Sequence, residues 1–282
     1  MSTSPPKPPG VHSMDDHVIG QIGLHACPPE DPCGPGLHLH LSPLLLEDDG
    51  HVDFGVLGVF LDMASSQAGP SRPFLHADIS VHRIGRPVGE KLFVDVRTLR
   101  EGRRTSIVQI EARDELGTRV ADSTQQISFP KPPAGDAPAV DPEEMAKMHR
   151  RFMDRFDGAC RLTGRLHDII GLDTATDADG QTYWTMPLGP SSRNGFGGLH
   201  GGVAFDLVTE AAVGGATAVL GPVDAHGALL RYLAPAMVGP FRAAPVVMPQ
   251  DDGSVFVRVE VYDDGNDALL CILGEVHLAR RT

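Results

Sequence analysis

A glycine-rich turn followed by an apolar run, RNGFGGLHGGVAFDLVTE, carries the residues with the clearest potential for chemistry. Asn194 and His200 lie in the turn, and Gly201 opens a run whose apolar spacing predicts a helix. The first N–H groups of such a helix, at the positive end of its dipole, stabilise negative charge on a bound oxygen. A hydrolytic site also needs a base, and the turn contains no acidic side chain. The chain is therefore an enzyme whose acid lies elsewhere, a damaged enzyme or a binding module.

The composition is that of a soluble globular protein. The 282 residues, 41% of them hydrophobic, suffice for one large domain or two of average size. A net charge of −13 argues against a general nucleic-acid-binding surface. No apolar run approaches the ~20 residues that cross a bilayer, and the N-terminus does not resemble a signal peptide. We therefore expect a cytoplasmic protein that binds neither nucleic acid nor membrane.

Residues that could bind metals or phosphates give weaker indications. Four cysteines are scattered without the paired spacing of a zinc site: Cys27, Cys33, Cys160 and Cys271. Their spacing would allow a Cys27–Cys33 disulfide, but the expected reducing compartment argues against one. His38 and His40 share a face of a predicted strand, yet two histidines without a third ligand are a poor metal site. Serine-nucleophile and phosphate-loop motifs are missing from the sequence. A hydrolytic site of the kind described above needs neither a metal nor a redox cofactor, and we expect none.

Two proline-rich stretches divide the chain. Residues 1–14 are too rich in proline and small polar residues to pack, and we expect them to be disordered. Residues 130–142 have a similar composition and separate two segments of comparable length, as a linker would. The sequence therefore predicts a first domain over 15–129 and a second over 143–282.

The two halves resemble each other. DFGVLGVFLDMASSQAG from Asp53 aligns with HGGVAFDLVTEAAVGGA from His200, and at a nearly constant offset of about 150 residues His76 aligns with His226. Each half predicts a strand, a turn with glycine, one long buried helix and then three or four strands. Residues 255–262, VFVRVEVY, alternate apolar and polar side chains as a half-buried antiparallel strand does. The chain thus looks like a tandem duplication.

A buried helix wrapped by a curved antiparallel sheet is the hotdog fold. NGFGGLHGGVAFDLVTEAA followed by RYLAPAMVG resembles the motif of the acyl-CoA thioesterase branch of hotdog proteins, which includes phenylacetyl-CoA thioesterases. The first half keeps the layout but lacks the Asn and the His-Gly-Gly. The resemblance implies an α+β double hotdog, with the two helices side by side and one joint sheet. It also implies an acyl-CoA substrate and, as we expect, a homodimer of such chains.

The same resemblance implies where the catalytic acid lies. In that family one hotdog supplies the Asn and the glycine after the His, which match Asn194, His200 and Gly201. The partner supplies a carboxylate nine residues after its own His position. That position is Thr209 in the second half and Asp62 in the first, so the resemblance implies one composite site per chain. The pseudo-symmetric counterpart, expected to be inactive, would consist of Glu47, Asp53, Phe54 and Thr209.

Thioester cleavage gives each of these residues a role. Negative charge grows on the carbonyl oxygen, and the Gly201 N–H would donate to it. Asp62 would act as a general base on water or as a nucleophile that forms a mixed anhydride. Asn194 would orient the water or the carbonyl, or simply form a turn with the next glycine. His200 would hold the turn by hydrogen bonding.

Other residues could take part in catalysis or substrate binding. Glu210, next to the vacant position, competes for the role of the acid, and Asp206 one turn earlier is a weaker competitor. Gly202 would line the substrate site, and Arg231 and Arg83 could meet the phosphates of coenzyme A. Small residues late in the second helix could leave room for a bulky acyl group: Gly214, Gly215 and Ala216.

Two other functions remain open from the sequence. A hotdog enoyl-CoA hydratase would add water to a double bond with an Asp/His pair. A non-catalytic acyl-CoA or lipid-binding module would explain the degenerate first half.

Overall fold

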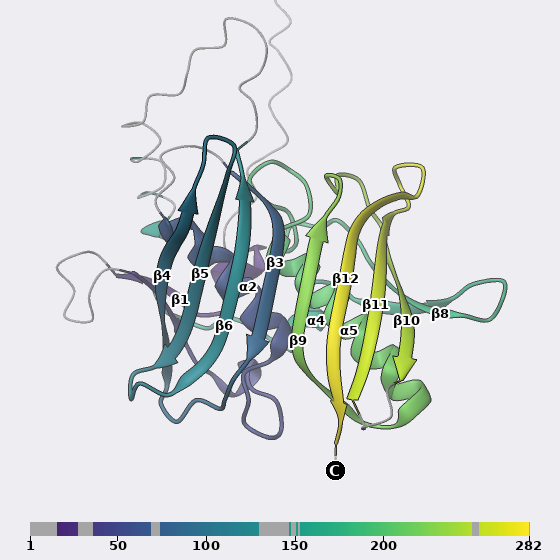
Figure 1. The fold of residues 1–282 in the computed structure, drawn as a ribbon, viewed down its shortest axis with the longest axis horizontal. Helices are drawn as coiled ribbons and strands as arrows, with labels where there is room; N and C mark the ends of the chain where they lie inside the picture. Colours follow the sequence, from purple (N-terminus) through teal and green to yellow (C-terminus); the bar gives the residue numbers. More distant parts are fainter. Residues whose placement is uncertain are drawn as a thin grey trace, which may run out of the picture.

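The computed structural model describes residues 16–27, 36–68, 74–129, 147, 151, 153–249 and 254–281. The expected disordered N-terminus (1–14), the expected linker (130–142) and Cys33 lie outside these residues. Within the described ranges, one antiparallel sheet extends across the whole molecule (Figure 1).

This sheet contains twelve strands in the order β1-β2-β4-β5-β6-β3-β9-β12-β11-β10-β8-β7. In chain order the strands are β1 (Leu24–Cys27), β2 (Gly36–His40), β3 (Leu75–Arg83), β4 (Lys91–Glu101), β5 (Thr105–Asp114), β6 (Arg119–Ser128), β7 (Asp173–Thr176), β8 (Thr182–Met186), β9 (Val223–Tyr232), β10 (Phe241–Pro249), β11 (Ser254–Asp263) and β12 (Leu269–Arg280). The prediction of an α+β protein with a large antiparallel sheet is confirmed. The strand predicted at 255–262 is β11, where Val255, Val257, Val259 and Val261 are all buried.

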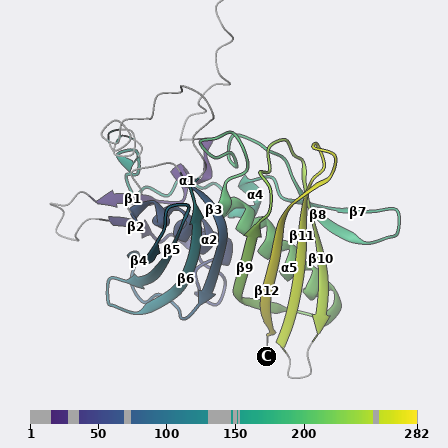
Figure 2. The same ribbon diagram turned by 45° about the horizontal axis from the view of Figure 1, so that its top comes forward.

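Two longer helices lie on the same face of the sheet (Figures 1 and 2). They are α2 (Phe54–Ala64) and α5 (Gly201–Leu220); the other described helices are α1 (Val18–Gln21) and α4 (Leu166–Ile169), with 3-10 turns η2 (Pro43–Leu45) and η3 (Ser65–Ala68). Each longer helix begins at a side-chain cap. Asp53 Oδ1 accepts from the Val56 N–H at 3.0 Å, and His200 Nδ1 accepts from the Gly202 N–H at 3.2 Å.

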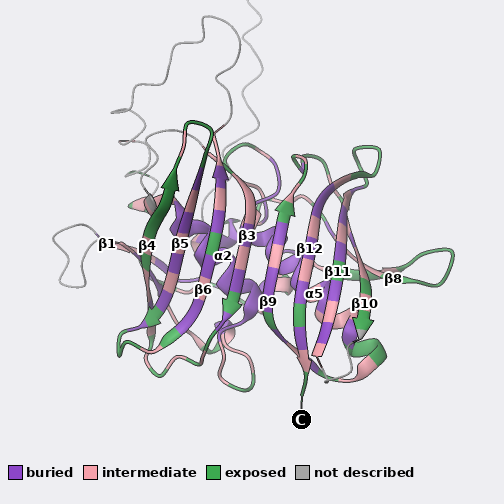
Figure 3. Ribbon diagram, in the orientation of Figure 1, coloured by how far each residue is buried: buried purple, intermediate pink, exposed green. Residues whose placement is uncertain are grey.

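The order of elements is the same on both sides of the molecule. β2 leads through η2 to α2 and then to β3–β6, while β8 leads to α5 and then to β9–β12. The two sides meet where β3 pairs antiparallel with β9, with Ile79 opposite Leu230. Because every residue of α2 and more than half of α5 are buried, the helices form the core under the sheet (Figure 3).

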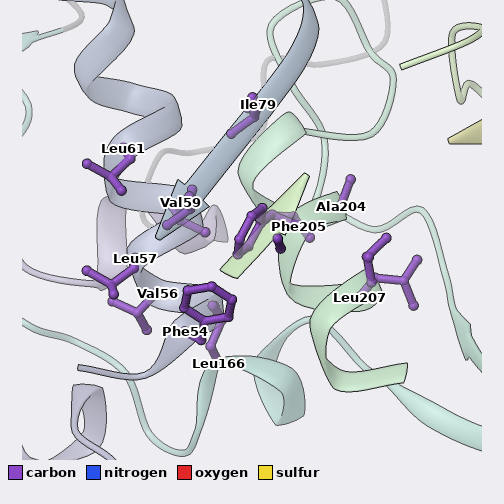
Figure 4. Packing of buried hydrophobic residues seen from close by; sticks show 14 of the residues in the cluster. Phe54, Val56, Leu57, Val59, Leu61, Ile79, Leu166, Ala204, Phe205 and Leu207 are labelled. Atoms are coloured by element: carbon purple, nitrogen blue, oxygen red, sulfur yellow. The ribbon is translucent and has the colours of Figure 1, made fainter. Parts of the chain in front are cut away.

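Glycines let α2 and α5 approach each other closely. A Cβ on Gly58 would lie 2.2 Å from Phe205 Cδ1, and a Cβ on Gly202 would lie 2.5 Å from Val59 Cα. Neither approach is possible for a larger residue. Around this crossing the Phe54 and Phe205 rings meet edge to face with centroids 5.3 Å apart (Figure 4). This close contact between α2 and α5, called the helix crossing below, determines which residues of α5 lie beside each end of α2.

One statement made from the sequence needs correction, because an apolar run of bilayer-spanning length is present. With 20 residues, α5 is long and apolar enough to cross a bilayer by length and composition alone. It is instead a core helix of this fold, since 56% of its most apolar window is buried inside the protein. It also carries Asp206 and Glu210.

Candidate active site

The helix crossing brings Asp62, near the C-terminus of α2, to the N-terminus of α5. Asp62 Oδ2 lies 3.4 Å from His200 Nε2, and both side chains are almost fully buried. A Cβ on Gly201 would lie 2.6 Å from Asp62 Oδ1, so the carboxylate rests directly against this glycine. The structure therefore brings together three residues of the predicted composite site, one from the first half of the chain and two from the second.

His200 has a defined tautomer. Its Nδ1 accepts the hydrogen bond of the Gly202 N–H, so in the neutral ring the proton is on Nε2, which faces Asp62. Burial lowers the pKa of His200; the Asp62 charge opposes this, and His76 adds to it. His200 thus caps α5, as expected, and also presents an N–H to the carboxylate.

A second histidine, not predicted for the site, contacts the same carboxylate. His76 on β3 places Nδ1 2.9 Å from Asp62 Oδ1. The contact is an ion pair rather than a straight hydrogen bond, because the buried Oδ1 accepts no well-directed hydrogen bond from the described residues. His76 Nε2 lies 3.0 Å from Ser65 Oγ, which donates to the Asp62 main-chain oxygen at 2.7 Å. The sequence showed His76 only as the repeat partner of His226, which is exposed.

These neighbours decide the charge of Asp62. Burial alone raises the pKa of a carboxyl group. Here the charges of His76 and then His200, with their polar contacts to the carboxylate, outweigh burial and lower the pKa of Asp62. Asp62 is therefore ionised at neutral pH, as a general base or nucleophile must be.

Tyr232, at the end of β9, holds the first turn of α5 from the other side. Its hydroxyl donates to the Gly201 carbonyl oxygen at 2.9 Å, and its ring centroid lies 6.4 Å from that of His76. Burial, then the charges of Asp62 and Asp78, raise the pKa of Tyr232 well above its usual value, so it stays a hydrogen-bond donor. Tyr232 belongs to the RYLAPAMVG motif, from which the sequence assigned it no role.

His17, just before α1, covers the outer side of His200. The two rings meet edge to face with centroids 5.3 Å apart. His17 Nδ1 accepts from the Ile19 N–H at 3.1 Å, and Nε2 contacts the Arg193 carbonyl oxygen. Burial, together with the nearby His200, lowers the pKa of His17 to about 3. No pattern in the sequence indicated this contact, because it joins segments that are far apart along the chain.

Asn194 shapes the turn before α5. Its Nδ2 donates to the Leu199 carbonyl oxygen at 3.0 Å, and its Oδ1 accepts from the N–H groups of Phe196 and Gly198 at 2.9 and 3.1 Å. Gly197 completes the turn in the left-handed region, with φ of +87°. Of the two predicted roles for Asn194, these contacts favour the turn over orientation of water or substrate.

The contacts of Arg83, Arg231 and Gly202 fit their predicted role in substrate binding less well. Arg83 is buried, pairs with Glu47 and donates to the Val52 carbonyl oxygen at 3.2 Å, so it is not available to a coenzyme A phosphate. Arg231 is partly exposed and bonds Glu275 at 2.8 Å. Gly202 serves the close packing of the two helices rather than a substrate surface.

The expected room for an acyl group late in α5 is already occupied. A Cβ on Gly214 would lie 2.1 Å from Trp184 Cζ2, and one on Gly215 would lie 2.8 Å from Pro245 Cγ. Ala216 is fully buried. These small residues accept side chains of β8 and β10, and that prediction is wrong.

Glu210 lies at the far end of the crossing from Asp62. It is nine residues beyond Gly201, which corresponds to about 14 Å along a helix. Burial, then the charges of Asp53, Glu47 and Asp168, raise its pKa to about 7. Its neighbours are thus the residues around the N-terminus of α2, and it does not share the site of Asp62.

Within the described ranges, no three His, Cys, Asp or Glu side chains converge as metal ligands. His38 instead lies with Nδ1 3.1 Å from Cys27 Sγ, and its ring packs on Phe93 at 4.1 Å between centroids.

No family model matches the sequence, and no curated protein sequence matches it. Solved structures do match. A tesB protein of Mycobacterium avium subsp. paratuberculosis is 11% identical with a TM-score of 0.62, over 94% of this chain and 98% of that one. Acyl-CoA thioesterase II TesB2 of Mycobacterium marinum is 10% identical with a TM-score of 0.59, over 94% and 96%. A hot dog fold protein of unknown function from Alicyclobacillus acidocaldarius is 12% identical with a TM-score of 0.57, over 87% and 93%. At this low identity the likeness concerns architecture, and the architecture of this chain is the hotdog fold.

Proposed function

We propose that the protein is an acyl-CoA thioesterase with one composite active site per chain. The observation that carries the proposal is the ionised, buried Asp62 of α2 lying against Gly201 at the N-terminus of α5. A base and an oxyanion-binding helix end thus converge from two parts of the chain. The tesB and acyl-CoA thioesterase names of proteins with this fold support the choice of thioester and of coenzyme A.

In the proposed reaction, water attacks the thioester carbonyl carbon while Asp62 Oδ2 takes its proton. The carbonyl oxygen becomes an oxyanion at the N–H of Gly201, which as the first residue of α5 has no acceptor within the helix. The tetrahedral intermediate then collapses by breaking the C–S bond. The leaving thiolate takes the proton from Asp62, giving a carboxylic acid and free coenzyme A.

We also propose that the chain is two hotdog units in tandem. Asp114 and Asp263, from the ends of β5 and β11, support this by making the same contacts: Asp114 accepts from the N–H groups of Val88 and Gly89, and Asp263 from those of Val238 and Gly239. The aligned residues Gly58 and Phe205 also touch each other, as expected on a pseudo-two-fold axis. A cytoplasmic homodimer remains our expectation, to be checked by light scattering.

Release of thiol from acyl-CoA, followed with a disulfide dye, tests the function. The substrates are acetyl-, hexanoyl-, palmitoyl- and phenylacetyl-CoA. Asp62→Asn should lower kcat by about 10²–10⁴-fold, the usual contribution of a general base. Glu210→Gln is the matched control, since it neutralises a buried acid at the other end of the crossing and should keep turnover. Silence of Glu210→Gln with an active Asp62→Asn would contradict the composite site.

Hydration of an enoyl-CoA is the second candidate, because the structure places His76 and His200 beside Asp62, the Asp/His pairing that such chemistry uses. Loss of the absorbance of the conjugated double bond, without thiol release, would replace the thioesterase proposal. Binding of acyl-CoA that Asp62→Ala leaves unchanged, with no turnover of either substrate by the wild type, would indicate a binding module.

A further inference from the structure

The contacts of His76 allow its protons to be counted. The Asp62 main-chain oxygen can only accept, so the Ser65 hydroxyl donates to it at 2.7 Å. A hydroxyl has one proton, and His76 Nε2 lies 3.0 Å from the same oxygen. The ring nitrogen must therefore donate to Ser65 Oγ, and Nε2 carries a proton.

The other nitrogen of His76 leads to the same result. In the proposed reaction Asp62 is the base, so its carboxylate is ionised and can only accept. An unprotonated Nδ1 at 2.9 Å from Oδ1 would set two lone pairs against each other in a buried place. Nδ1 therefore also carries a proton. His76 with a proton on each nitrogen is an imidazolium, which bonds Ser65 through Nε2 and forms an ion pair with Asp62 through Nδ1.

We propose, on the basis of the thioesterase function, that His76 is a positioning residue that rests as an imidazolium and holds Oδ1 of Asp62, leaving Oδ2 to take the proton of water. Ser65 fixes the far side of the ring, and His200 Nε2 lies 3.4 Å from Oδ2 on the opposite side of the carboxylate. The buried carboxylate is thereby kept charged and in one orientation, with Oδ1 against Gly201 and Oδ2 toward His200 at the cap of α5.

The surroundings permit only one charged histidine. The charged and titratable groups that face His76 come from four elements: Asp62 on α2, His200 at the cap of α5, Tyr232 on β9 and Asp78 on β3. His200 accepts from the Gly202 N–H and is neutral, and Tyr232 is a neutral phenol. The charge of His76 therefore faces two carboxyl groups, and the nearest cation, Arg231 opposite Asp78 on β9, bonds Glu275.

Nitrogen NMR of the full-length protein with ¹⁵N-labelled histidine measures the proposed state directly. We expect His76, identified by the signal that His76→Asn removes, to have both ring nitrogens protonated at pH 7. Ser65→Ala should shift it, because Nε2 loses its acceptor. The readout needs no turnover, so it separates failure of this inference from failure of the thioesterase proposal. A His76 ring with one unprotonated nitrogen at pH 7 would overturn the inference.

Kinetics provide the second arm. A hydrogen bond to a charged group contributes enough that His76→Phe should lower kcat by roughly 10- to 100-fold at unchanged KM. His76→Asn, which keeps a donor near the Nδ1 position, should retain more activity than His76→Phe. The matched control is His226→Phe, the exposed repeat counterpart on β9, with wild-type kcat expected. Equal kcat for His76→Phe and His226→Phe, with both proteins folded by circular dichroism, would also overturn the inference.

Discussion

The two ends of the helix crossing bury carboxyl groups of opposite character. At one end Asp62 faces histidine rings, and its pKa is lowered in spite of burial. At the other end Asp206 and Glu210 of α5 face Asp53, and burial together with neighbouring carboxyl groups raises the pKa of both. Neither side-chain oxygen of Asp206 has a hydrogen-bond partner among the described residues. One pair of helices thus holds an acid of lowered pKa at one end and two acids of raised pKa at the other.

The helix caps explain much of this difference. His200 caps α5 through Nδ1 and offers an N–H to a carboxylate, whereas Asp53 caps α2 with a negative charge that repels one. Gly201 leaves space for close approach, but the aligned Phe54 fills that space, with the Arg83 guanidinium 5.2 Å above its ring. The difference supports one active site per chain, at the end with histidine and glycine.

The largest effect expected for this comparison comes from Gly201, the residue that lets the Asp62 carboxylate approach the N-terminus of α5. In Gly201→Ala the new Cβ would lie 2.6 Å from Asp62 Oδ1 and 3.2 Å from Tyr232 Oη, so the carboxylate must move. We expect kcat to fall by about 10²–10³-fold, as when an oxyanion donor is lost. Thiol release measures this change. Gly195→Ala in the same turn is the control, because nothing lies within 4 Å of its Cβ position. Equal activity of the two variants would show that the approach to Gly201 is unimportant.

The second prediction tests the acidic end through stability. The pKa of Glu210 rises from 4.5 in the ordinary state to about 7 in the fold. The folded protein therefore holds this proton more tightly, and the group's stabilising contribution, complete below pH 4.5, is lost as pH rises through about 7. Glu210→Gln removes this dependence and should raise the free energy of unfolding at pH 8 by roughly 2–3 kcal/mol relative to wild type.

Urea unfolding at pH 5 and pH 8 measures that effect. Glu101→Gln, at an exposed position on β4, is the control and should change stability by less than about 0.5 kcal/mol at either pH. A Glu210→Gln protein with the same pH dependence as wild type would place the titrating group elsewhere.

Much of the fold was predictable because its signals are local. Strict alternation over 255–262 predicted β11, and the apolar residues of both helices predicted burial, as found for Val56, Val59, Leu207 and Val208. That α5 is long and apolar enough to cross a bilayer was missed, because its glycines and two acids interrupt the apolar run. Repetition between the halves carried information over longer distances, and together with the resemblance to hotdog thioesterases it singled out Asp62.

The remainder of the site depends on contacts that no local pattern encodes. His76 reaches Asp62 from β3, the strand that follows α2 and η3 in the chain, while the aligned His226 is exposed. His17 reaches His200 across the whole length of the chain. Asn194 shows the converse problem, since a turn-forming role and a catalytic role require the same residue type. What the sequence lacked was knowledge of which distant residues contact Asp62 and His200, rather than of the residue types themselves.

The smallest expected effect concerns Tyr232. Its hydroxyl holds the first turn of α5 and makes no hydrogen bond to the Asp62 carboxylate. Tyr232→Phe removes the 2.9 Å bond to the Gly201 carbonyl oxygen and keeps the ring beside His76. A net contribution of about 0.5–1.5 kcal/mol corresponds to a loss of about 2- to 10-fold in kcat, with KM unchanged. Thiol release again measures it.

Tyr262→Phe provides the comparison for that small loss, because its hydroxyl bonds Glu260 at 2.6 Å on β11, outside the site. Since the pKa of Tyr232 is raised, the difference between the two variants should persist at alkaline pH as far as the protein remains folded. Equal kcat for the two variants would mean that the first turn of α5 holds its place without Tyr232. A loss of kcat in Tyr232→Phe as large as that in Gly201→Ala would instead indicate that the Tyr232 hydroxyl contacts the substrate.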